Sequence, residues 1–82
     1  MARRDRMEIM VSILNTCSSE GANKTRIVYQ ANLNFRTVNP YLDTLEENGL
    51  IQVMGNERKL YKTTFKGLEL INDASNIIGM LK

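Results

Sequence analysis

The amino-acid sequence predicts a mainly α-helical fold that carries one small β-hairpin, and three observations lead to this fold class. Between Asn34 and Ile51 (NFRTVNPYLDTLEENGLI), apolar residues recur at steps of three and four, the spacing of a helix with one buried face. Gly49 stands where a helix C-terminus favours positive φ, and the short apolar run Leu50–Met54 then predicts a strand. A small, charged turn at 55–58 leads to Lys59–Thr64 (KLYKTT), which is rich in the β-favouring residues Tyr and Thr. The sequence therefore predicts a helix followed by a hairpin with a charged tip.

Two helices are expected before this segment. From about Asp5 to Cys17, apolar residues cover more than half of the helix circumference, so the first helix needs two packing partners. Ser18–Asn23 (SSEGAN) predicts a loop, and Lys24–Ala31 predicts a short second helix. Asn34 follows a short turn and is a suitable N-cap for the third helix. The second and third helices together form a helix-turn-helix.

Pro40 lies within the third helix and leaves two possible starts for it. Proline inside a helix removes a backbone hydrogen bond at a cost of about 3 kcal/mol, so a helix over residues 35–48 would be bent before Pro40. In the alternative, Asn39 is the N-cap and Pro40 takes the first helical position, where proline is well tolerated. We favour the early, bent helix because Phe35 and Val38 extend its apolar face.

A fourth helix is expected from about Thr64, its N-cap, to Leu81, and it carries two apolar stripes. One stripe, through Leu68, Ile71 and Ile78, can close the domain's own core. The other has no evident partner in so small a domain and predicts a subunit contact. Its residues are Leu70, Ala74, Ile77 and Leu81. Residues 64–82 are therefore expected to form a C-terminal dimerisation helix, although both stripes could instead wrap the first helix within one chain.

Composition sets the size and charge of the domain. Eighty-two residues, of which 43% are apolar, support a single domain over residues 1–82. The net charge of +2 does not by itself indicate a nucleic-acid binder. Residues 1–36, however, hold six basic and three acidic residues, so the basic excess lies in and before the helix-turn-helix.

Several function classes are disfavoured by the residue types present. One cysteine cannot form an internal disulfide, and without histidine there is no His/Cys cluster for zinc, so we expect no metal and no cofactor. Without histidine or a Gly-rich phosphate loop, no catalytic residues are evident and an enzyme is not expected. The start of the chain (MARRDRMEIM) lacks the apolar core of a signal peptide, so a cytoplasmic protein with no membrane partner is expected.

Three segments of the sequence resemble a known family. YLDTLEENGLI (41–51), YKTTFKG (61–67) and KTRIVYQANLNF (24–35) are similar to the small archaeal winged helix-turn-helix transcriptional regulators. The family includes abundant archaeal DNA-binding proteins with a dimerising C-terminal helix. The resemblance implies a winged helix-turn-helix fold: a three-helix core, a β wing and a long C-terminal helix.

These patterns together predict a dimeric protein that binds double-stranded DNA, most simply a transcriptional regulator. Helix 35–48 would read the major groove and the wing at 55–59 would contact the backbone or minor groove. Cationic and polar residues at the start of the second helix, on the third helix and at the wing are the candidate contacts: Lys24, Thr25, Arg26, Arg36, Thr37, Asn39, Arg58 and Lys59. The alternatives are a less specific chromatin-associated DNA-binding protein and a winged-helix module for protein–protein interaction.

Overall fold

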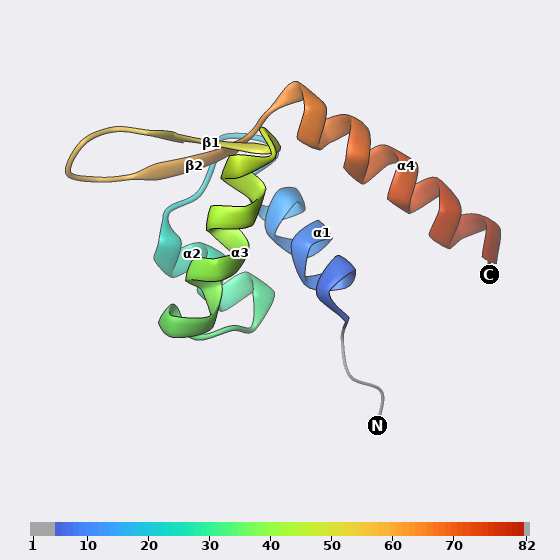
Figure 1. Cartoon of the computed structure of the whole chain (residues 1–82), viewed down its shortest axis with the longest axis horizontal. Coiled ribbons are helices and arrows are strands. Elements are labelled where there is room, and N and C mark those ends of the chain that lie inside the picture. Colours follow the sequence, from blue (N-terminus) through green and yellow to red (C-terminus); the bar gives the residue numbers. More distant parts are fainter. Residues whose placement is uncertain (1–4, 82) are drawn as a thin grey trace.

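Four helices and one antiparallel hairpin make up the fold (Figure 1). The computed structural model describes the backbone of residues 5–81 and the side chains of residues 5–73. The elements are α1 (Arg6–Thr16), α2 (Lys24–Ala31), α3 (Phe35–Glu47), β1 (Ile51–Met54), β2 (Leu60–Thr63) and α4 (Phe65–Leu81). The fold class predicted from the sequence is confirmed, with element boundaries within one or two residues of those expected.

Polar side chains fix where the first three helices begin. Asp5 caps α1 by accepting a hydrogen bond from the Glu8 N–H, and Asn23 caps α2 by accepting one from the Arg26 N–H. Asn34 caps α3, as the sequence predicted, and its side chain accepts from two backbone N–H groups. Each cap satisfies N–H groups that a helix N-terminus leaves without an intrahelical partner.

The third helix starts early and continues through Pro40. The expected start at Phe35 is confirmed, and the alternative with Asn39 as N-cap is wrong. Pro40 cannot donate to the carbonyl of Arg36, but both residues are exposed, so water can satisfy that carbonyl. The expectation that Phe35 is buried is also wrong, because its side chain is 54% exposed. Phe35 lies one turn before Val38, the first fully buried residue of α3, and so falls beyond the edge of the core.

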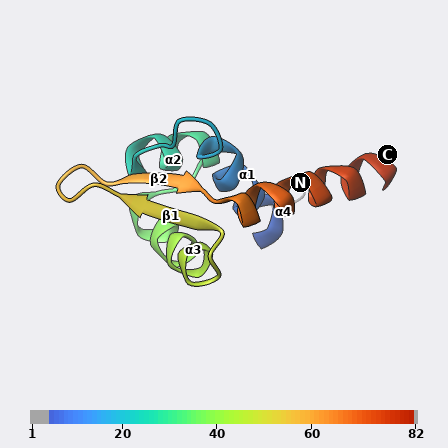
Figure 2. The ribbon, with the colours of Figure 1, turned by 90° about the horizontal axis from the view of Figure 1, so that it is seen from above.

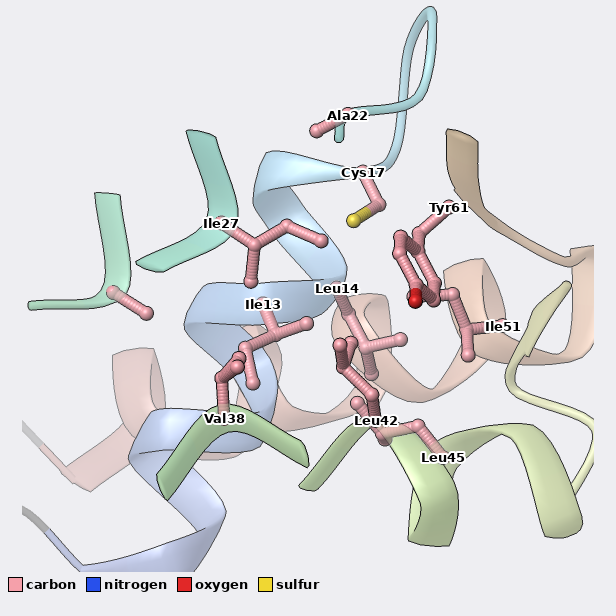
Figure 3. Close-up of a cluster of buried hydrophobic side chains, with 11 residues drawn as sticks. Ile13, Leu14, Cys17, Ala22, Ile27, Val38, Leu42, Leu45, Ile51 and Tyr61 are labelled. Atoms are coloured by element: carbon pink, nitrogen blue, oxygen red, sulfur yellow. The ribbon is translucent and has the colours of Figure 1, made fainter. Parts of the chain in front are cut away.

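A single core joins the three helices to the hairpin (Figure 3). Its largest fully buried side chains are Ile13, Leu14, Cys17, Ile27, Val38, Leu45 and Ile51. Tyr61 is buried in the same cluster, and Tyr41 packs against it at the edge of the core. The core fixes how α2 and α3 are oriented toward each other and toward the hairpin.

A residue of the loop between α1 and α2 also pairs with the hairpin, and the sequence did not predict this pairing. β1 and β2 pair in the register Ile51↔Thr63 to Met54↔Leu60. Ala22, in the loop before α2, forms an antiparallel bridge with Tyr61 through two 2.8 Å backbone hydrogen bonds. One bridging residue has no periodic pattern, so the segment was predicted only as a loop. The bridge holds the start of α2 beside the hairpin.

The fourth helix is anchored at its start and then leaves the body of the domain (Figures 1 and 2). Thr64 donates from its hydroxyl to the Gly49 carbonyl at 2.6 Å, and its N–H donates to the Leu50 carbonyl at 3.0 Å. Leu70 and Ile71 are half-buried and pack against the core.

Leu68, expected in the core-closing stripe, is 41% exposed, whereas Leu70, expected in the subunit stripe, contacts the core. Ala74, Ile77, Ile78 and Leu81 lie outside the side chains that the structure describes. Within the described part of the chain, no helix is both long and apolar enough to cross a membrane.

Candidate nucleic-acid interface

The start of α2, the start of α3 and the wing occupy one side of the molecule, and α4 leaves from the other (Figure 1). Of the predicted contact residues, Thr25, Arg36, Asn39, Arg58 and Lys59 are exposed, and Lys24 is half-buried. The fold thus brings residues from three separate parts of the sequence onto one face.

A groove lies between the first turn of α2 and the wing. Its lining residues are Asn23, Lys24, Thr25, Glu57, Arg58, Lys59 and Tyr61. Four of these were predicted from the sequence as contact residues. The other three were not, because Asn23 is a helix cap, Glu57 is acidic and Tyr61 belongs to an apolar pattern. Three cationic side chains and the backbone N–H groups of a helix N-terminus surround the groove, against one carboxylate, that of Glu57.

A hydrogen bond joins the groove to the third helix. The Lys24 ammonium donates to Asn39 Oδ1 at 2.8 Å, between residues that are 15 positions apart in sequence. Sequence reasoning had treated these two side chains as separate contacts. No local motif signals the bond, because it depends on how α2 crosses α3.

The exposed face of α3 differs in charge between its two halves. Arg36 and Asn39 lie on the first half, and Asp43 and Glu47 lie on the second. At about 100° per residue, Arg36, Asp43 and Glu47 point in similar directions, away from the buried face. Carboxylates repel phosphates, so the first half of the helix is the half suited to approach a nucleic acid. Reading helices of this kind contact bases through their N-terminal residues.

Two of the predicted contact residues, Thr37 and Arg26, do not line the groove. The Thr37 N–H donates to Asn34 Oδ1 at 2.7 Å, and the Thr37 hydroxyl accepts from the Asn34 N–H at 3.2 Å, which closes a capping box. The first role of Thr37 is therefore to fix the start of α3. Arg26 does not line the groove, although its positive charge is close enough to Cys17 to act on that thiol.

The wing turn depends on a glycine. Gly55 has φ +87°, and a Cβ there would lie 2.5 Å from the Arg58 carbonyl oxygen. Only glycine adopts this conformation without strain in so tight a turn. Gly55 therefore sets the path that places Arg58 and Lys59 at the groove.

The lone cysteine is buried, and its surroundings set its protonation state. Burial raises the pKa of the Cys17 thiol to about 11, an effect that the Arg26 charge only partly opposes. The thiol is thus protonated at neutral pH and is a poor nucleophile. Among the described residues, no group of three or more His, Cys, Asp or Glu side chains could hold a metal ion.

Known proteins are similar to this chain in sequence or in structure. It is 31% identical to an uncharacterized protein of Methanocaldococcus jannaschii over 77 residues. The aligned region covers 85% of this chain and 79% of that protein. Its structure is similar to the crystal structure of Sso10a-2, a DNA-binding protein from Sulfolobus solfataricus. The TM-score is 0.83 and the sequence identity is 35%, over 94% of this chain and 81% of that chain. The winged helix-turn-helix family matches residues 3–82, and the chain belongs to this family, as its resemblance to the small archaeal members predicted.

Proposed function

We propose that this protein binds double-stranded DNA as a homodimer and acts as a transcriptional regulator. The observation that carries the proposal is the groove that joins Lys24 and Thr25 to the wing residues Arg58 and Lys59, together with the Lys24–Asn39 hydrogen bond that extends it to α3. The similarity to a DNA-binding protein over 94% of the chain supports it.

In the proposed complex, each element has a distinct task. The first half of α3 enters the major groove with Arg36 and Asn39 toward the bases, where Arg pairs with guanine and amide side chains pair with base edges. The backbone N–H groups at the start of α2 and the cations of the wing lie along phosphates on either side, so they position the helix without reading sequence. Asp43 and Glu47 then lie away from the backbone, because α3 is inserted by its N-terminal half.

The proposed dimer forms through α4. This helix has 17 residues, about 25 Å of length, and Figures 1 and 2 show that it continues beyond the body of the domain. The proposed contact stripe is Leu70, Ala74, Ile77 and Leu81, of which Leu70 is shared with the domain's own core. A two-fold dimer would present two reading helices to half-sites about 34 Å apart, which compensates for the few cations of each subunit.

Salt dependence of duplex binding tests the proposal. If Arg58 and Lys59 of both subunits each neutralise a phosphate, log K falls with log salt at a slope of about −3.6, so affinity falls about 150-fold between 50 and 200 mM salt. Replacing both Arg58 and Lys59 by Ala should reduce this slope by about 1.8 per subunit. The control Arg6→Ala, at the start of α1, removes one charge away from the groove and should leave the slope unchanged.

Selection from randomised duplexes then separates the kinds of DNA binder. An enriched two-fold motif supports the regulator, whereas uniform binding supports the less specific chromatin-associated protein. A weak, salt-insensitive association with DNA would instead refute both and favour a protein-interaction module.

A further inference from the structure

We propose that Lys24 and Asn39 act together as one donor-presenting unit that selects guanine, in place of the adenine that an asparagine would select alone. The inference rests on the DNA-binding function proposed above and concerns which base that site reads. It makes Lys24 a specificity-determining residue although it belongs to α2 and not to the reading helix.

The hydrogen bond defines the orientation of the Asn39 amide. Lys24 carries three donors and no acceptor, so the atom that it contacts at 2.8 Å must be the amide oxygen. The usual uncertainty over which end of an asparagine amide is the oxygen does not arise here. The Asn39 oxygen therefore faces Lys24, and its NH₂ group is the part left for another partner.

The scaffold around the pair is built to keep this arrangement. Asn32 adopts a left-handed conformation with φ 54°, and the next residue, Leu33, donates to the Val28 carbonyl to end α2. Asn34 then caps α3 only two residues later. The end of α2 is thus fixed relative to the start of α3, and Lys24 is half-buried, which limits the rotamer freedom that the bond must restrict.

The chemistry of the base edges decides the preference. Adenine in the major groove offers one acceptor, N7, and one donor, N6–H₂, so an asparagine reads it with its NH₂ and its oxygen together. The Lys24 ammonium already donates to the Asn39 oxygen, so it competes with the adenine N6–H₂ group for the lone pairs of that oxygen. It also brings a positive charge close to the adenine amino group. Guanine offers two acceptors, N7 and O6, which the Asn39 NH₂ and the Lys24 ammonium can satisfy together.

Arg36, one helical turn before Asn39, should also favour guanine. It precedes Asn39 by three positions on the exposed face of α3, and its guanidinium also only donates hydrogen bonds. The first half of the reading helix therefore offers donors to the bases, which matches neighbouring guanines.

The test compares duplex selections by the protein and by two matched variants. The unmodified protein should prefer guanine over adenine by about tenfold at the position read by residue 39. Lys24→Met keeps the aliphatic stem and removes the donors, so that position should change from guanine to adenine. Lys59→Met removes the same charge at the wing and should weaken binding on every sequence without changing the base. Lys24→Arg retains cationic donors and should keep guanine.

A second measurement detects the pair without DNA. In the free protein, the Asn39 side-chain amide resonances should shift in Lys24→Met and stay in place in Lys59→Met. Unchanged resonances in both variants would overturn the inference.

Two binding results would also overturn it. One is adenine selected by the unmodified protein. The other is a Lys24→Met variant that keeps guanine and only lowers the salt slope by about 0.9 per subunit, since Lys24 would then be a phosphate contact. If no duplex is bound while the amide shift is seen, the proposed function fails although the pair exists.

Discussion

Gly67 is the residue on which the docking of α4 depends most directly. It lies in the first turn of α4 and is buried, and a Cβ there would lie well inside contact distance of the Leu50 carbonyl oxygen and 2.6 Å from Thr63 Cγ2. The carbonyl belongs to the backbone between α3 and β1, so it cannot move aside as a flexible side chain would. In Gly67→Ala, α4 must shift away from the hairpin.

The expected loss can be worked from the contacts at this junction. Three hydrogen bonds anchor the helix start: Thr64 N–H to Leu50 O at 3.0 Å, Thr64 Oγ1 to Gly49 O at 2.6 Å, and Lys66 Nζ to Asn48 O at 2.9 Å. At about 1 kcal/mol each, their loss costs up to about 3 kcal/mol. Alanine is favoured over glycine inside a helix by about 1 kcal/mol, so the net destabilisation is about 2 kcal/mol.

Thermal unfolding followed by circular dichroism measures this effect. A destabilisation of about 2 kcal/mol should lower Tm by roughly 8–16 °C in a domain of this size. Gly49→Ala is the matched control: Gly49 has φ +71° with no atom within 4 Å of an added Cβ, so only backbone strain of about 1 kcal/mol is expected. A Gly67→Ala protein that melts at or above the temperature of the unmodified protein would refute the docking geometry of α4.

Three further predictions address the reading helix, the core and the dimer. Arg36→Ala should weaken binding to a preferred duplex by about 1 to 3 kcal/mol and relax the preference at one base; an equal loss on all sequences would make Arg36 a phosphate contact. The pKa of Cys17 rises from 9.0 to about 11 on folding, so the thiol's contribution to the free energy of unfolding is intact below pH 9. As pH rises to 11, the free energy of unfolding should fall by about 2 kcal/mol. The unfolding free energy of Cys17→Ala should therefore fall less over this range, and identical profiles would contradict the burial argument. Ile77→Glu should give a folded monomer with much weaker DNA binding, whereas sedimentation of the unmodified protein as a single 9.4 kDa species would exclude the dimer.

The helices could be predicted from the sequence because their signals are local. Each cap and the apolar period that follows it lie within a few residues, as Asn34 and the Val38–Leu45 face of α3 show. Phe35 was misplaced for the same reason. Periodicity gives the direction of a side chain around the helix, but it does not say where along the helix the core ends. The end of the core is set by what packs against α3.

The sequence predicted candidate contact residues, but it did not indicate which of them contact one another. Charge and position singled out Lys24, Asn39, Arg58 and Lys59 as candidates, but no local pattern indicated that Lys24 contacts Asn39 or that both wing cations line a groove with the start of α2. Those relations depend on the crossing of α2 and α3 and on the single bridge between Ala22 and Tyr61. The bridge places the wing beside α2, so a change that breaks it would separate the proposed phosphate contacts of the wing from the proposed reading helix while leaving every candidate residue in the sequence unchanged. In the proposed complex, the geometry of binding therefore depends on backbone pairing in the α1–α2 loop as well as on the exposed side chains.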